Sequence, residues 1–201
     1  MSNSTVLTNY TELLNNLNVL NKETEQKVIA ENPDEFVTRN INFFTKSFTI
    51  TICAYLESFL KDISMTIIDD TNRKLSESKI AHNLVKWSVL KKKDLKDLND
   101  SELLFEDLTI KITKKELDDF ISGNPYKTEK LFNKIGIKLY ENDKYREHKD
   151  KVQTIVNKRN KIVHHNDNAS DISFNDIDSN IKIILEYIEN IDSIIQVELN
   201  K

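Results

Sequence analysis

The chain has 201 residues, a length that suits one domain with its own hydrophobic core. Only 2 Gly and 2 Pro are present, which argues against folds built from many tight turns, such as β-sandwiches, β-propellers and Rossmann-type phosphate loops. A net charge of -4 does not favour indiscriminate nucleic-acid binding, and 38% hydrophobic residues at helical spacing predict a soluble, mostly helical protein.

The first predicted element is an amphipathic helix over about residues 5–29. Leucines at 13, 14, 17 and 20 recur at helical spacing, and Asn21 marks a point where the helix could break. The N-terminus has no basic flank followed by an apolar stretch, so we expect no secretory signal.

A long helix is predicted next, over about 34–69. Asn32-Pro33-Asp34 provides the start signal, and the apolar face that follows is broad and aromatic. This pattern is typical of a central helix packed on more than one side. Charged residues interrupt its most apolar part, 48–68, so we expect no membrane insertion. The lone Cys53 excludes a disulfide within the chain and a Cys-based zinc site, and favours a reducing, cytoplasmic location.

The middle of the chain has a weaker pattern. A helix is predicted over 79–92, while the alternation at 108–113 fits either a short strand or an extended link. Gly123-Asn124-Pro125 is a break, and short helical pieces should follow over 126–139.

Two further helices close the chain, over about 145–163 and 174–199, with a polar turn at 166–171. The sequence therefore predicts an all-α helical bundle with a long central helix and a partly irregular middle insertion. We expect a single domain, 1–201, divided into an N-terminal helix (1–30), a long helix (34–70), a variable helical insertion (71–140), and a motif helix with a C-terminal helix (144–199).

Charge is distributed unevenly between the last two helices. Residues 144–165 carry seven cations and two acids, whereas 166–201 carry eight acids and two lysines. Either the basic segment forms a phosphate-binding surface, or the two segments face water and each other.

One residue on the predicted motif helix stands out. Apolar side chains at 152, 155, 156, 162 and 163 form one stripe, and Arg159 falls at its centre. Such an arginine either pairs with a carboxylate from a neighbouring helix or lies at an interface. Asn160 and His164 are four residues apart and share a side of the helix. His164 belongs to the expected last turn, where imidazole is well suited to proton exchange.

Arg159-Asn160-Lys161-Ile162-Val163-His164 resembles the Arg-x4-His signature of the HEPN superfamily. The stretches 54–61 (Ala-Tyr-Leu-Glu-Ser-Phe-Leu-Lys) and 130–137 (Lys-Leu-Phe-Asn-Lys-Ile-Gly-Ile) are similar to the RiboL-PSP type of HEPN protein. The resemblance extends over most of residues 34–199.

The resemblance implies a helical bundle that dimerises so that two motifs face each other, often as a metal-independent ribonuclease of toxin–antitoxin or antiviral defence systems. Arg159 and His164 then take the catalytic positions, and Asn160 the polar position. RNA, a second copy of the chain and an antitoxin or defence-system protein are the implied partners, and no cofactor or metal is implied. Some members paired with a nucleotidyltransferase antitoxin carry a tyrosine two residues after the histidine. Asn166 occupies that position here, which argues against such a partner.

Metal-independent RNA cleavage suits these residue types. A histidine can transfer the protons, and an arginine can stabilise the phosphorane formed when the 2'-hydroxyl attacks. Because one chain supplies one such histidine, acid and base would come from His164 of two subunits, and the stripe around Arg159 would be the dimer seam.

Four more residues are candidates for supporting roles. Lys158 and Lys161 are predicted phosphate contacts, and His165 either assists with phosphate or caps the helix. Glu57 either orients Arg159 or is an ordinary solvated carboxylate.

Two other functions fit the same residues. The chain could be a non-catalytic HEPN-like module that binds RNA, a nucleotide or a protein within a defence or regulatory complex. Alternatively, it could be a helical interaction protein in which Arg159 only fixes packing.

Overall fold

The computed structural model describes residues 3–78, 80, 85, 109–165 and 167–200, and every regular element within them is helical. The all-α prediction is confirmed, while most of the predicted helix at 79–92 lies outside the described residues. The elements are α1 (Thr5–Ile29), α2 (Glu35–Arg39), α3 (Ile41–Ser76), α5 (Lys114–Asp118), α6 (Pro125–Lys134), η3 (Leu139–Glu141), α7 (Asp143–His165) and α8 (Phe174–Leu199).

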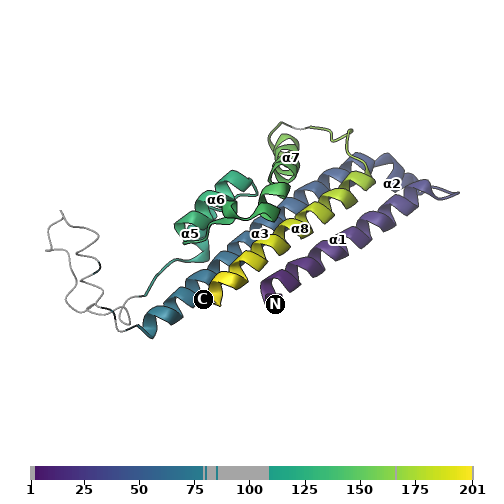
Figure 1. Cartoon of the computed structure of the whole chain (residues 1–201). Coiled ribbons are helices and arrows are strands. Elements are labelled where there is room, and N and C mark those ends of the chain that lie inside the picture. Colours follow the sequence, from purple (N-terminus) through teal and green to yellow (C-terminus); the bar gives the residue numbers. More distant parts are fainter. Residues whose placement is uncertain (1–2, 79, 81–84, 86–108, 166, 201) are drawn as a thin grey trace.

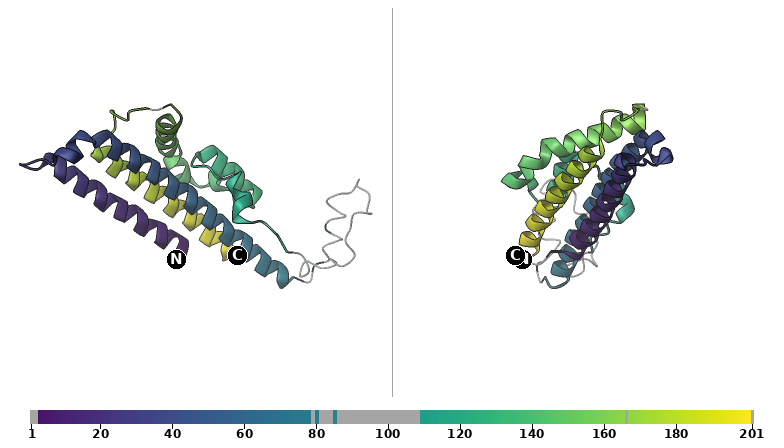
Figure 2. Two further views of the ribbon diagram at one scale, coloured as in Figure 1. Left: turned by 180° about the vertical axis from the view of Figure 1, so that it is seen from behind. Right: turned by 90° about the vertical axis from the view of Figure 1, so that its right-hand side faces the viewer.

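Three long helices, α1, α3 and α8, lie side by side and form the body of the bundle (Figure 1). The start of α1 and the end of α8 lie near the same end of this bundle (Figures 1 and 2). The centre of the core is a stripe of fully buried isoleucines along α8, at positions 177, 181, 184, 188, 191 and 195. Their spacing of three and four residues keeps them on one face of the helix.

The first and last helices begin and end where the periodicity predicts. Ser4 caps α1 by accepting a hydrogen bond from the Leu7 amide, and Ser173 and Asp176 form a capping box at the start of α8. Asn21 does not break α1. Its side-chain amide is buried and donates to the Phe174 carbonyl oxygen at 3.0 Å, so it joins α1 to α8.

The long predicted helix is divided in two at Asn40. Its backbone, with φ -115° and ψ 21°, leaves the helical region, and its side-chain amide donates to the Phe36 carbonyl oxygen. Beyond this break, α3 continues to Ser76, seven residues past the predicted end at 69. No helix in the described part of the chain combines the length and apolar content needed to cross a membrane.

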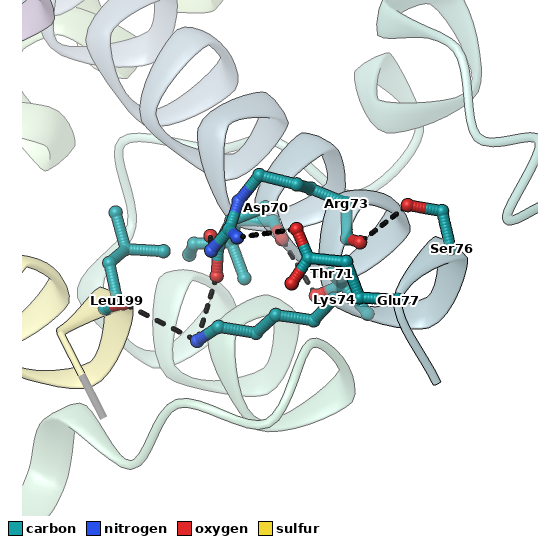
Figure 3. Close-up of polar contacts among 8 residues, drawn as sticks. Asp70, Thr71, Arg73, Lys74, Ser76, Glu77 and Leu199 are labelled. Atoms are coloured by element: carbon teal, nitrogen blue, oxygen red, sulfur yellow. Dashed lines mark hydrogen bonds and ion pairs between the residues drawn. The ribbon is translucent and has the colours of Figure 1, made fainter. Parts of the chain in front are cut away.

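The C-terminal ends of α3 and α8 are joined by one lysine (Figure 3). The Nζ atom of Lys74 lies 3.0 Å from the Asp70 carboxylate on its own helix and 3.3 Å from the Leu199 carbonyl oxygen at the end of α8. Lysine is well suited to this position because the last carbonyl groups of a helix have no intrahelical donor.

Residues 109–113 form an extended link rather than a regular strand. The side-chain amide of Asn72 in α3 pairs with Ile110, accepting from its amide nitrogen at 2.8 Å and donating to its carbonyl oxygen at 3.2 Å. One side chain thus supplies the hydrogen bonds that a neighbouring strand would give. Short helical pieces follow, as predicted, with Gly136 at a φ of +87° between α6 and η3.

Helix α7 runs across the long helices rather than along them (Figures 1 and 2). It packs against α3 and α8. At its N-terminal end, Tyr187 of α8 donates to the Tyr145 hydroxyl, which donates to the Pro125 carbonyl oxygen of α6. Both tyrosines are fully buried, so these bonds fix how α7 sits between α6 and α8.

Candidate functional site

The apolar stripe of α7 belongs to the core of the single chain. Val152, Ile155, Val156 and Ile162 are all buried against the rest of the molecule, whereas Val163 is 50% exposed. The prediction that this stripe forms a dimer seam is therefore wrong for these four residues, because they are already buried within one chain.

Arg159 extends from this stripe to Glu57 on α3. Its Nη2 atom donates to Glu57 Oε1 at 2.9 Å and to Oε2 at 2.8 Å. The side chains are 22% and 30% exposed, so the ion pair is shielded from water but still reaches the surface. A carboxylate that accepts twice fixes the guanidinium more tightly than a single contact would.

Glu57 is held in turn by the backbone of the loop before α6. The Gly123 amide donates to Glu57 Oε1 at 3.3 Å. A Cβ atom at Gly123 would lie 3.0 Å from Val156 Cγ2 and 3.7 Å from Glu57 Oε1. Glycine therefore lets the loop approach α3 and α7 closely, and the Glu57–Arg159 pair joins three segments that are far apart in the sequence.

The other motif residues lie at or near the surface of α7. Asn160 is half-buried, and its side-chain oxygen accepts from Arg159 Nη1 at 3.1 Å. His164 and His165 are exposed in the last turn of the helix, and Lys161 is exposed one turn earlier. The structure thus brings Arg159, Asn160 and Glu57 into one hydrogen-bonded group, with His164 on the same helix.

Lys158 has a different environment. Its Nζ atom lies 2.9 Å from an oxygen of Asp167 and 2.5 Å from an oxygen of Asp171, both in the turn between α7 and α8. Here the basic motif helix and the acidic segment that follows it contact each other directly.

Cys53 lies close enough to the ion pair for the charges of Arg159 and Glu57 to act on its thiol, and it is completely buried. Burial raises the pKa of its thiol to about 12, although the charge of Arg159 acts in the opposite direction. The thiol is therefore protonated at neutral pH and poorly suited to nucleophilic chemistry. Within the described ranges, no three His, Cys, Asp or Glu side chains are grouped so as to hold a metal ion.

Sequence reasoning did not identify three residues that shape the site: Gly123, Asp167 and Asp171. The pattern Gly123-Asn124-Pro125 predicts a chain break, and it gives no sign that the backbone amide of the glycine faces a carboxylate. Asp167 and Asp171 belong to a polar turn. The only sequence signal that they pair with Lys158 is the excess of lysine on the preceding helix.

The structure is thus a bundle of long helices in which a late helix, α7, carries Arg-x4-His. A carboxylate of α3 holds the arginine. The chain belongs to the RiboL-PSP-HEPN family, whose model matches residues 7–197. The match includes α1 and so begins earlier than the resemblance over 34–199 indicated. Comparisons with curated proteins and with solved structures found no significant match.

Proposed function

We propose that the chain is a metal-independent endoribonuclease whose site is Arg159, Asn160 and His164. Membership of a HEPN family supports a nuclease or RNA-binding role. The observation that carries the proposal is a guanidinium fixed by Glu57 at a partly exposed position, on the same helix as an exposed histidine.

In this proposal the 2'-hydroxyl of the RNA attacks the adjacent phosphorus, and the 5'-oxygen leaves. Histidine removes the proton from the attacking oxygen or returns one to the leaving oxygen, an effect worth about 100- to 10,000-fold. Arg159 stabilises the charge that develops on the phosphorane, which for one well-placed donor is worth about 3–4 kcal/mol. Because the oxygen of Asn160 faces Arg159, the N–H donors of its amide are directed to other acceptors such as a phosphate oxygen.

Separate acid and base require two copies of His164, so we propose a homodimer in which two motifs face one shared phosphate. Exposed apolar side chains on α7 and on α3 support this arrangement. Val163 precedes His164 and is 50% exposed. On α3, Phe43 is 65% exposed and Ile50 is 38% exposed. Positions 43, 50 and 57 are seven residues apart, so these two side chains lie on the same face of α3 as Glu57.

Lys161 and His165 are the proposed phosphate contacts, because both are exposed on the last turns of the motif helix. Such contacts position RNA without reading its sequence. We also propose a cytoplasmic setting and an antitoxin or defence-system protein as the partner that controls the activity.

The test is cleavage of total RNA in EDTA by purified protein and by His164→Ala and Arg159→Ala. Each substitution should lower cleavage by about 100-fold or more. His148→Gln is the matched control, because His148 lies on the same helix and is bonded to Glu186 instead. Cleavage that survives both motif substitutions would contradict the proposed site. Toxicity on expression that either substitution relieves would agree with it.

One observation favours a non-catalytic HEPN-like binding module as the second candidate. The guanidinium of Arg159 already has a carboxylate partner within its own chain, as a purely structural arginine would. The same experiment separates the two candidates, because a binding module retains RNA, a nucleotide or a protein in a filter or pull-down assay but leaves RNA intact.

A further inference from the structure

Lys158 is surrounded by the turn that connects α7 to α8. Its side chain is 19% exposed and its ammonium group contacts both Asp167 and Asp171. Partial burial alone would lower the pKa of Lys158, but the hydrogen bonds to Asp171 and Asp167 and the negative charges of these two residues together raise it. The lysine is therefore charged and fully engaged at neutral pH.

The same turn is fixed at two other points. The second carboxylate oxygen of Asp167 accepts from the Ala169 amide at 2.7 Å, and the Asp167 amide donates to the Lys161 carbonyl oxygen at 3.3 Å. Ala169 has a φ of +52°, and its side chain is completely buried. A residue other than glycine holds this left-handed conformation only where its surroundings impose it.

We infer that Lys158 is a positioning residue, which with Asp167 and Asp171 fixes the last turn of α7 and hence the imidazole of His164. This inference rests on the proposed function for the role of His164. Asp167 follows the end of α7 at His165 by only two positions, so the chain between them is short. Anchoring Asp167 to Lys158 therefore restrains the end of the helix that carries the histidine.

The local charge argues against Lys158 as a phosphate contact. The ammonium group and its two carboxylates together carry a charge of about -1, which repels a phosphate at short range. Lys161 lies one turn further along α7 and is exposed, so it can approach phosphate more freely.

The two roles predict opposite effects for Asp171→Asn and Asp167→Asn. If Lys158 contacts phosphate, removing a competing carboxylate should tighten RNA binding and leave cleavage equal or faster. If Lys158 positions the helix end, each substitution should slow single-turnover cleavage by about 10-fold or more, because misplaced catalytic groups are costly. We expect the second result, with RNA affinity nearly unchanged at fixed salt concentration.

Amide hydrogen exchange over residues 160–172 gives a readout that needs no catalysis. We expect Lys158→Met and Asp171→Asn to speed exchange there, and Lys161→Met, which removes the same charge from the same helix, to leave it unchanged. Tighter RNA binding by the aspartate variants with unaltered exchange would overturn the inference. If the unsubstituted protein cleaves no RNA, the proposed function fails, while the exchange pattern still decides whether Lys158 holds the turn. Asp171 is largely exposed, so Asp171→Asn should fold even if Lys158→Met does not.

Discussion

At the residue scale, the feature that most constrains function is the contact between Arg159 and Glu57. A charged group on an apolar helix face requires a partner, so the sequence could indicate that Arg159 was unusual and that Glu57 was a candidate for it. It could not show that the stripe beside them would be covered by the same chain, since an apolar helix face packs equally well on its own core or on a second subunit. The Gly123 amide was beyond prediction because backbone donors carry no sequence signature.

Glu57→Gln tests whether this carboxylate positions Arg159. The amide keeps one acceptor but loses the charge, so we expect single-turnover cleavage to fall by about 10- to 100-fold while RNA affinity is kept or slightly raised. Glu129→Gln is the matched control, because it removes an ion pair to Lys149 of similar exposure away from the motif. Equal rates for the two variants would show that Glu57 has no special role.

Gly123→Ala tests whether the loop must approach α7 closely. The added methyl group would meet Val156 Cγ2, so we expect a loss of about 1 kcal/mol in the free energy of unfolding and slower cleavage. Val156→Ala removes that contact, and the double variant should be more stable than the sum of the two single effects predicts. Strictly additive effects at 123 and 156 would contradict a close approach.

At Gly136, where nothing lies within 4 Å of the added atom, alanine should cost stability through its positive φ alone.

At the element scale, the long amphipathic helices were predictable because their apolar residues recur at helical spacing over many turns. The division of the long helix at Asn40 was not predictable, because asparagine is tolerated in helices. The break is visible only in the structure, in the backbone angles of Asn40 and in its side-chain bond to the Phe36 carbonyl oxygen. The alternation of apolar and polar residues at 108–113 is compatible with either a short strand or an extended link. Over 109–113 the structure forms a link because the partner of Ile110 is a side chain of α3 and not another strand.

Ser173→Ala tests the start of α8, the helix that supplies the centre of the core. Loss of the Ser173 hydroxyl should reduce the free energy of unfolding by about 1 kcal/mol, because the Asp176 amide loses its acceptor. Urea denaturation measures this change. Ser179→Ala is the control, since its exposed hydroxyl donates only to a carbonyl oxygen within the helix. A Ser173 variant as stable as the control would rule out the cap as a stabilising feature.

At the scale of the whole molecule, stability should depend on ionised aspartates. Hydrogen bonds from Ser173 lower the pKa of Asp176, and those from Lys182 and Asn18 lower the pKa of Asp178. When a carboxyl group has a lower pKa in the folded chain than in the unfolded chain, its ionised form stabilises the fold. This stabilisation is complete at pH values above the unfolded pKa of about 3.9, and it is lost as the pH falls towards the folded pKa. The urea midpoint should therefore decrease as the pH falls below about 4.5, and less steeply for Asp176→Asn. A midpoint that is constant or rises on acidification would contradict this.

The motif lies on one helix at the surface of the bundle. A site with two copies of His164 therefore needs two molecules. The most direct test is to coexpress the unsubstituted chain with His164→Ala in known ratios and measure RNA cleavage in EDTA. If both copies of His164 act at one phosphate, mixed dimers are inactive, and an equal mixture should retain about one quarter of the activity. Activity that falls in simple proportion to the unsubstituted chain, to about one half, would show that each molecule acts alone.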